Sequence, residues 1–103
     1  MLFKKHIFFS MNIKKTVNKF LDQIHAATEQ NPDIISFDIE DSICLKTIKK
    51  FKLEKILNDI SPPDIQWQDL FSEKYKIDDK TKIEMLKNLK KLYGEAGINL
   101  DFS

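Results

Sequence analysis

The residue types best suited to catalysis in this chain are a single cysteine and two histidines. Cys44 could act as a nucleophile only if a base such as His6 or His25 lay beside it. Nothing around Cys44 matches a cysteine-enzyme signature, and it falls among apolar residues at helical spacing, where a small buried side chain is expected. We therefore predict that Cys44 has a structural role.

Acidic residues gather in two clusters, which are Asp38, Glu40 and Asp41, and Asp78 with Asp79. Two carboxyl groups can share general acid and base work when their environments differ. Neither cluster has calcium-loop spacing, a glycine-rich phosphate loop or an HExxH metal motif beside it. We expect both clusters to flank or cap helices. The sequence thus predicts a non-enzymatic protein with no catalytic residue, no cofactor and no metal site.

Length and charge indicate one domain without a strong electrostatic field. The chain has 103 residues, of which 42% are hydrophobic, so a single domain over 1–103 can bury a modest core. Its 17 basic residues are all lysines and nearly balance 16 acids. The lack of arginine disfavours bidentate reading of guanine or phosphate.

The cysteine count and the N-terminal sequence bear on location. One cysteine cannot form an internal disulfide, which favours a reducing compartment. The start, MLFKKHIFFS, has too short an apolar run for a signal peptide, and no stretch is long enough to span a membrane. We expect a cytoplasmic protein. Whether residues 1–10 join the core or form an arm outside it stays open.

Hydrophobic periodicity predicts four helices in an antiparallel bundle, over residues 12–28, 42–60, 62–76 and 79–93. The first has one apolar stripe, with Ser10 or Asn12 as its cap. The second is expected to be kinked near Lys52. Ser61 and Pro62 predict the start of the third, in which Trp67 should be buried. Gly94 or Gly97 should end the fourth, before a short extended tail.

A second fold hypothesis is an α+β domain. Ile35, Phe37 and Ile39 alternate with polar residues, as in a strand with one buried face. The same alternation appears in the C-terminal tail. Strands over 3–9, 34–40 and 98–102 would then form a small sheet against the helices.

The stretch EMLKNLKKLYGEAGIN, residues 84–99, is similar to the last helix and tail of enterocin-A-type bacteriocin immunity proteins. The similarity rests on Glu84, Asn88 and Leu89, and on the run from Ala96 to Asn99. The resemblance implies a small cytosolic four-helix bundle that neutralises a toxin, with specificity in its C-terminal part. The rest of the chain does not share it, and a Ser-Pro-Pro break is not typical of that family.

These observations favour a small module that regulates or neutralises a protein partner, as an inhibitor or immunity protein does. The candidate partner-binding residues lie in the last helix and the tail; they are Tyr93, Ile98, Leu100, Phe102, Lys90 and Lys91. The alternative is a nucleic-acid-associated regulator that uses two lysine-rich helix faces to contact phosphates. These faces are formed by Lys46, Lys49, Lys50, Lys52 and Lys55, and by Lys80, Lys82, Lys87, Lys90 and Lys91. The oligomeric state is left open.

Overall fold

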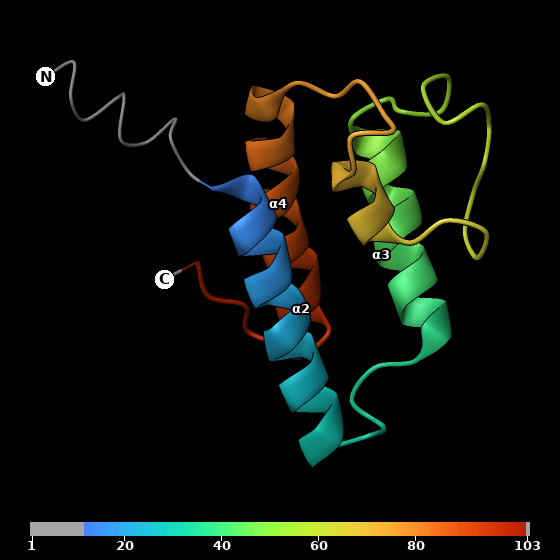
Figure 1. Cartoon of the computed structure of the whole chain (residues 1–103). Helices are drawn as coiled ribbons and strands as arrows, with labels where there is room; N and C mark the ends of the chain where they lie inside the picture. Colours follow the sequence, from blue (N-terminus) through green and yellow to red (C-terminus); the bar gives the residue numbers. More distant parts are fainter. Residues whose placement is uncertain (1–11, 103) are drawn as a thin grey trace, which may run out of the picture.

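The computed structural model describes residues 12–102, and this part of the chain is mainly helical. Its elements are α2 (Ile13–Gln30), α3 (Phe37–Lys50), the 3₁₀ helix η1 (Trp67–Phe71) and α4 (Asp79–Glu95). Helix α3 runs opposite to α2 and α4, and α4 packs against both of them (Figure 1). The prediction of a helical domain is confirmed, with three α-helices in the described residues instead of four.

Each α-helix begins at a polar side chain that accepts a hydrogen bond from a backbone N–H three residues later. The capping residues are Asn12 for α2, Ser36 for α3 and Asp78 for α4, with donor–acceptor distances of 3.0, 3.2 and 2.8 Å. Such caps satisfy N–H groups that have no partner within the helix. The predicted helices over 12–28 and 79–93 are therefore confirmed, to within two residues at their ends.

The second helix was predicted over 42–60, and the structure places it earlier. Ser36 starts it at Phe37, and it ends at Lys50 because Lys52 adopts a left-handed backbone, with φ of 55°. The Leu53 N–H then donates to the Ile48 carbonyl at 3.0 Å, closing the helix end. Residues 54–59 form turns, in which Asn58 and Asp59 also have positive φ.

The prediction of a third helix over 62–76 is wrong. Within that range only η1 is helical, and it begins after Gln66 instead of Ser61. The Gln66 N–H donates to the Asp69 carboxylate at 3.0 Å, which fixes the start of this short helix. The Ser72 hydroxyl donates to the Asp69 carbonyl at 2.8 Å where the helix ends. The rest of the segment is irregular.

The α+β alternative is also wrong in the part that the structure describes, since no strand occurs within residues 12–102. Residues 34–40 contain the start of α3, and residues 98–102 form an extended tail without a strand partner. The third predicted strand, 3–9, lies outside the described residues, as does the whole of the possible arm over residues 1–10.

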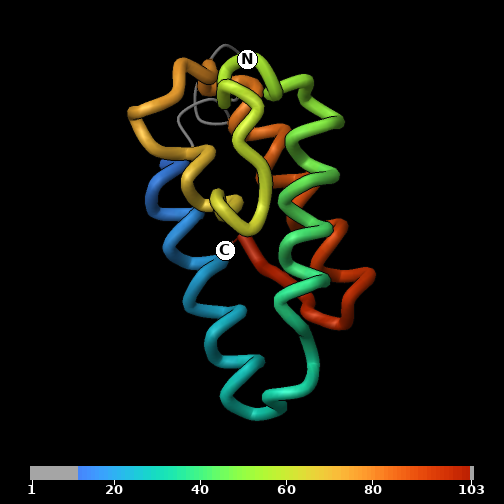
Figure 2. The backbone as a smooth tube through the Cα atoms, turned by 90° about the vertical axis from the view of Figure 1, so that its right-hand side faces the viewer, coloured from blue at the N-terminus to red at the C-terminus, as the bar shows by residue number. Residues whose placement is uncertain are grey.

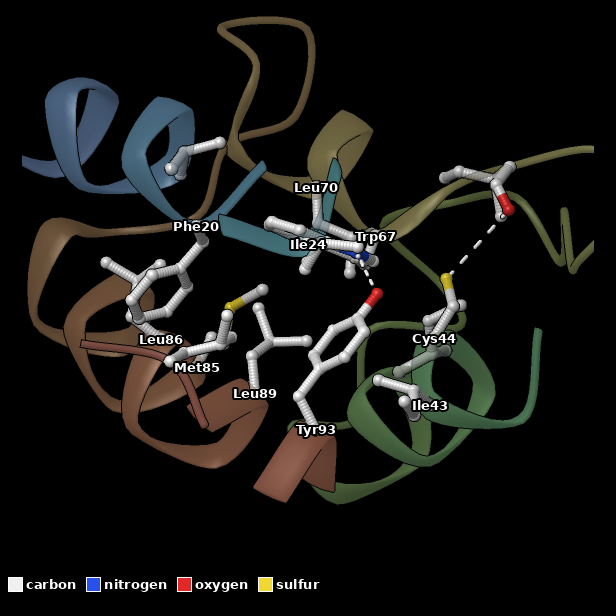
Figure 3. Packing of buried hydrophobic residues seen from close by; sticks show 14 of the residues in the cluster. Phe20, Ile24, Ile43, Cys44, Trp67, Leu70, Met85, Leu86, Leu89 and Tyr93 are labelled. Carbon is white, nitrogen blue, oxygen red and sulfur yellow. Dashed lines mark hydrogen bonds between the residues drawn. The ribbon is translucent and has the colours of Figure 1, made fainter. Parts of the chain in front are cut away.

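The core lies between α2, α3, η1 and α4 (Figure 3). Large side chains from all four elements are fully buried there; among them are Phe20, Ile48, Leu70, Met85, Leu86, Leu89 and Tyr93. Trp67 is 2% exposed, which confirms its predicted burial, and its indole Nε1–H donates to the Tyr93 hydroxyl at 2.8 Å. This bond satisfies the one polar group of the indole ring.

The C-terminal tail turns back along α2 (Figure 2). Gly97 has φ of 95°, and the Ile98 N–H donates to the Tyr93 carbonyl at 2.8 Å. The Gln23 side-chain amide then bonds both the N–H and the carbonyl of Asp101, each at 2.8 Å. Two apolar side chains of the tail are buried in the core. Among residues 12–102, no helix is both long and apolar enough to cross a membrane.

Candidate functional site

The most unusual surface feature is Phe37, whose side chain is 90% exposed. It is the first residue of α3, next to the capping residue Ser36. The cap and the first turn fix the backbone beneath the ring, while the ring itself has almost no contact with the protein. Burying a phenylalanine is favourable by about 1.5–3 kcal/mol, so a ring held in water is a ready contact for another molecule.

Two hollows lie on either side of Phe37, and it lines both. The larger hollow, of about 490 Å³, lies between the end of α2, the α2–α3 connection and the start of α3. Thr28, Asp33 and Ile35 are among its lining residues. The smaller, of about 240 Å³, lies between α3 and the segment before η1; it is lined by Phe37, Glu40, Asp41, Cys44, Gln66 and Trp67. We call Phe37 and these two hollows the Phe37 surface. It combines a projecting ring with adjacent concave walls, as a protein-binding site does.

The Phe37 surface is acidic. Asp33, Asp38, Glu40 and Asp41 all fall within residues 31–45, a stretch that contains no lysine. Partial burial raises the pKa of the Glu40 carboxyl above its usual value, and the neighbouring Asp41 charge raises it further. The Glu40 and Asp41 carboxylates therefore repel each other, and a cation brought between them would be stabilised.

Cys44 lies at the floor of the smaller hollow but is poorly suited to nucleophilic chemistry. It is 2% exposed, and its Sγ faces the Ile65 carbonyl oxygen at 3.9 Å. Burial, with Asp41 and Asp69 nearby, raises the pKa of the thiol to about 12. The predicted buried position is confirmed. His25 is exposed and pairs with Glu29 at 2.9 Å, while His6 lies outside the described residues.

The structure divides the predicted partner-binding residues into two groups. Tyr93, Ile98 and Leu100 are part of the core, and Phe102 is half-buried against the Phe20 ring, with 5.2 Å between centroids. Lys90 and Lys91 are exposed on α4. In this state only the two lysines and part of Phe102 are accessible to a partner.

The two predicted lysine faces approach each other between α3 and α4. A hollow of about 320 Å³ is lined there by Lys50, Phe51, Glu84, Lys87, Asn88 and Lys91. The Asn88 amide connects the helices, because it donates to the Thr47 hydroxyl at 3.2 Å and accepts from Lys50 Nζ at 3.3 Å. Lys87 is paired with Glu84 at 3.1 Å. In this basic groove, lysines from both predicted sets contribute to one surface.

Sequence reasoning missed Phe37 because the four-helix prediction began its second helix at residue 42, and the α+β alternative placed Phe37 on the buried face of a strand. Ile35 is indeed buried, at 8% exposure, but the helix begins between these two residues and turns the next side chain outward. The signal that could have found it is Ser36 followed by Asp38 and Glu40. A capping residue and acids in the next turn indicate a helix start.

Comparison of the chain with models of known protein families, with curated proteins and with solved structures gave no significant match. The geometry described above therefore carries the functional argument.

Proposed function

We propose that this protein is a small binding module that regulates or neutralises a protein partner, and that the partner docks on the Phe37 surface. The observation that carries the proposal is the 90% exposure of Phe37 on a capped helix end between two hollows. Exposed aromatic anchors beside concave surfaces are typical of binding hot spots, where a few side chains supply most of the affinity. An inhibitor or immunity protein is one form that such a module takes.

The test is affinity capture from a lysate of the source organism with two matched baits, the wild-type protein and a Phe37→Ala variant. Because Phe37 makes few contacts, the substitution should change the free energy of unfolding by less than about 0.5 kcal/mol. A specific partner should be retained by the wild type and lost with Phe37→Ala. Loss of a central aromatic anchor typically weakens binding by about 2 kcal/mol or more.

Leu45→Ala is the matched control, since Leu45 is also on α3 and is 39% exposed but lines neither hollow. It should retain the same partner as the wild type. If all three baits capture the same proteins in the same amounts, the Phe37 surface is not the docking site. Direct titration of the purified partner then gives the affinity of each variant.

A second candidate function is nucleic-acid association through the basic groove, favoured by the convergence of Lys50 and Lys91 on one hollow. Binding to random duplex DNA or single-stranded RNA should then weaken steeply with salt, because phosphate contacts release counterions. Lys50→Gln with Lys91→Gln should reduce both the affinity and the salt dependence. Absence of binding at low salt would remove this candidate.

A further inference from the structure

The smaller hollow of the Phe37 surface has the composition of a cation site. Its walls combine the carboxylates of Glu40 and Asp41 with the Phe37 ring and the Gln66 amide, and none of its lining residues is basic. Its volume of about 240 Å³ compares with roughly 30 Å³ for one water molecule in the liquid. The hollow is thus large enough for a long side chain.

Neither carboxylate has a cationic side chain as its partner in the described part of the chain. Neither takes part in an ion pair or accepts a hydrogen bond among residues 12–102. Glu40 is also partly buried, so its charge is poorly solvated as well as close to that of Asp41. A cation placed between them would offset both effects at once.

The shape of the hollow favours a side-chain cation over a bare metal ion. A lysine or arginine side chain has an apolar stem that packs on an aromatic ring while its charged end meets carboxylates. Phe37 provides the ring at the rim, and Glu40 and Asp41 provide the carboxylates within. Arginine suits this arrangement best, because its planar group both stacks on rings and bonds carboxylates in pairs.

The surrounding charges select the same class of partner. Asp33 lines the larger hollow, and Asp38 is exposed in the first turn of α3. A partner that carries several basic residues would find acids around Phe37, whereas a phosphate backbone would be repelled.

We infer that the partner presents a basic segment to this protein, with one lysine or arginine side chain in the hollow between Glu40, Asp41 and Phe37. This inference rests on the proposed function and names the chemistry of its partner. The Phe37 ring packs against apolar groups next to that basic residue.

The test uses acetylated and amidated peptides that have one sequence except for a central arginine, lysine, leucine or glutamate. Trp67 is the only tryptophan of the chain and lines the hollow, so its fluorescence reports occupancy. The arginine peptide should bind with a Kd on the order of millimolar or tighter. The leucine and glutamate peptides should bind at least about tenfold more weakly.

The protein variants are Glu40→Gln with Asp41→Asn, and a control of equal net charge, Asp22→Asn with Glu54→Gln. The control acids are exposed and line none of the hollows around Phe37. The first pair should weaken the arginine peptide by at least about tenfold, and the control by less than about twofold.

Equal binding of the arginine and leucine peptides, no binding of either, or an unchanged affinity in the Glu40→Gln, Asp41→Asn variant would each overturn the inference. The proposed function is judged separately, by partner capture with Phe37→Ala. If a partner is lost with Phe37→Ala but retained by the double carboxylate variant, the proposed function stands. The inference that the partner presents a basic segment is then wrong.

Discussion

The Trp67 indole donates a hydrogen bond of 2.8 Å to the Tyr93 hydroxyl. Both rings are almost completely buried and meet edge to face, with 6.3 Å between their centroids. This bond joins η1 to α4 at the centre of the core (Figure 3). A buried N–H without a partner is costly, so the short η1 helix depends on Tyr93 for its position.

Tyr93→Phe should therefore lower the free energy of unfolding by about 1–3 kcal/mol, because the indole N–H loses its acceptor while the ring packing is kept. Urea unfolding followed by circular dichroism measures the change. Tyr75→Phe is the control, since Tyr75 is only half-buried, and its effect should stay within about 0.5 kcal/mol. Equal effects of the two substitutions would contradict the role of the bond.

The two glycines near the end of α4 should respond to alanine in opposite directions. Gly97 has φ of 95°, where a Cβ is strained, so Gly97→Ala should cost about 1–2 kcal/mol. Gly94 is inside the helix, and the nearest atom to an added Cβ would be 3.9 Å away. Gly94→Ala should raise stability by up to about 1 kcal/mol. Thermal unfolding of both variants tests the sign of each effect.

Leu100→Ala should lower the free energy of unfolding by about 2–5 kcal/mol, since Leu100 is 2% exposed and fills the core between the helices. The neighbouring exposed residue gives a matched control, Asn99→Ala, with an expected change within about 0.5 kcal/mol. Denaturant titration distinguishes them. A neutral Leu100→Ala would mean that the tail is not part of the stable core in solution.

Glu40 should make stability depend on pH in a defined direction. Folding raises the pKa of this acid, so its contribution is present below the unfolded pKa of about 4.3 and is lost as pH rises through the folded value. Glu40→Gln should thus be more stable than the wild type at pH 7, with a difference that closes in acid. An Asp41→Asn background should shrink the difference. Unfolding curves across this pH range show whether the sign is right.

Cys44 should resist thiol reagents in the folded protein. With a pKa of about 12 and 2% exposure, it has little thiolate at pH 8 and little access. Labelling by a chromogenic disulfide should be slower than in urea by on the order of a thousandfold. Fast labelling of the native protein would show that the hollow opens to its floor.

The sequence predicted those elements that local signals determine. The apolar stripes of α2 and α4 were readable because they depend on residues within one or two turns. The same local signals narrowed the caps to two candidates each, Ser10 or Asn12 and Asp78 or Asp79. Burial of Trp67 and Cys44 followed from their apolar surroundings. Ser61 and Pro62 predicted a helix start that the structure does not have. The helix in this segment begins after Gln66, where the Gln66 N–H bonds to the Asp69 carboxylate.

Long-range contacts could not be read from the sequence. The bonds between Gln23 and Asp101 join residues 78 positions apart, and they show that the tail belongs to the core instead of a sheet. The exposure of Phe37 likewise depends on where α3 starts, which shifts the direction of every side chain in that segment. Hydrophobic periodicity alone therefore could not predict the candidate site.

Helix α3 separates charge along the molecule. Four acids and no lysine occupy residues 31–45, while five lysines and one acid occupy residues 46–55. A net charge of +1 therefore conceals a separation of opposite charges along this segment. At low ionic strength an approaching partner would experience a torque before contact, and the same protein should be retarded by both anion- and cation-exchange resins.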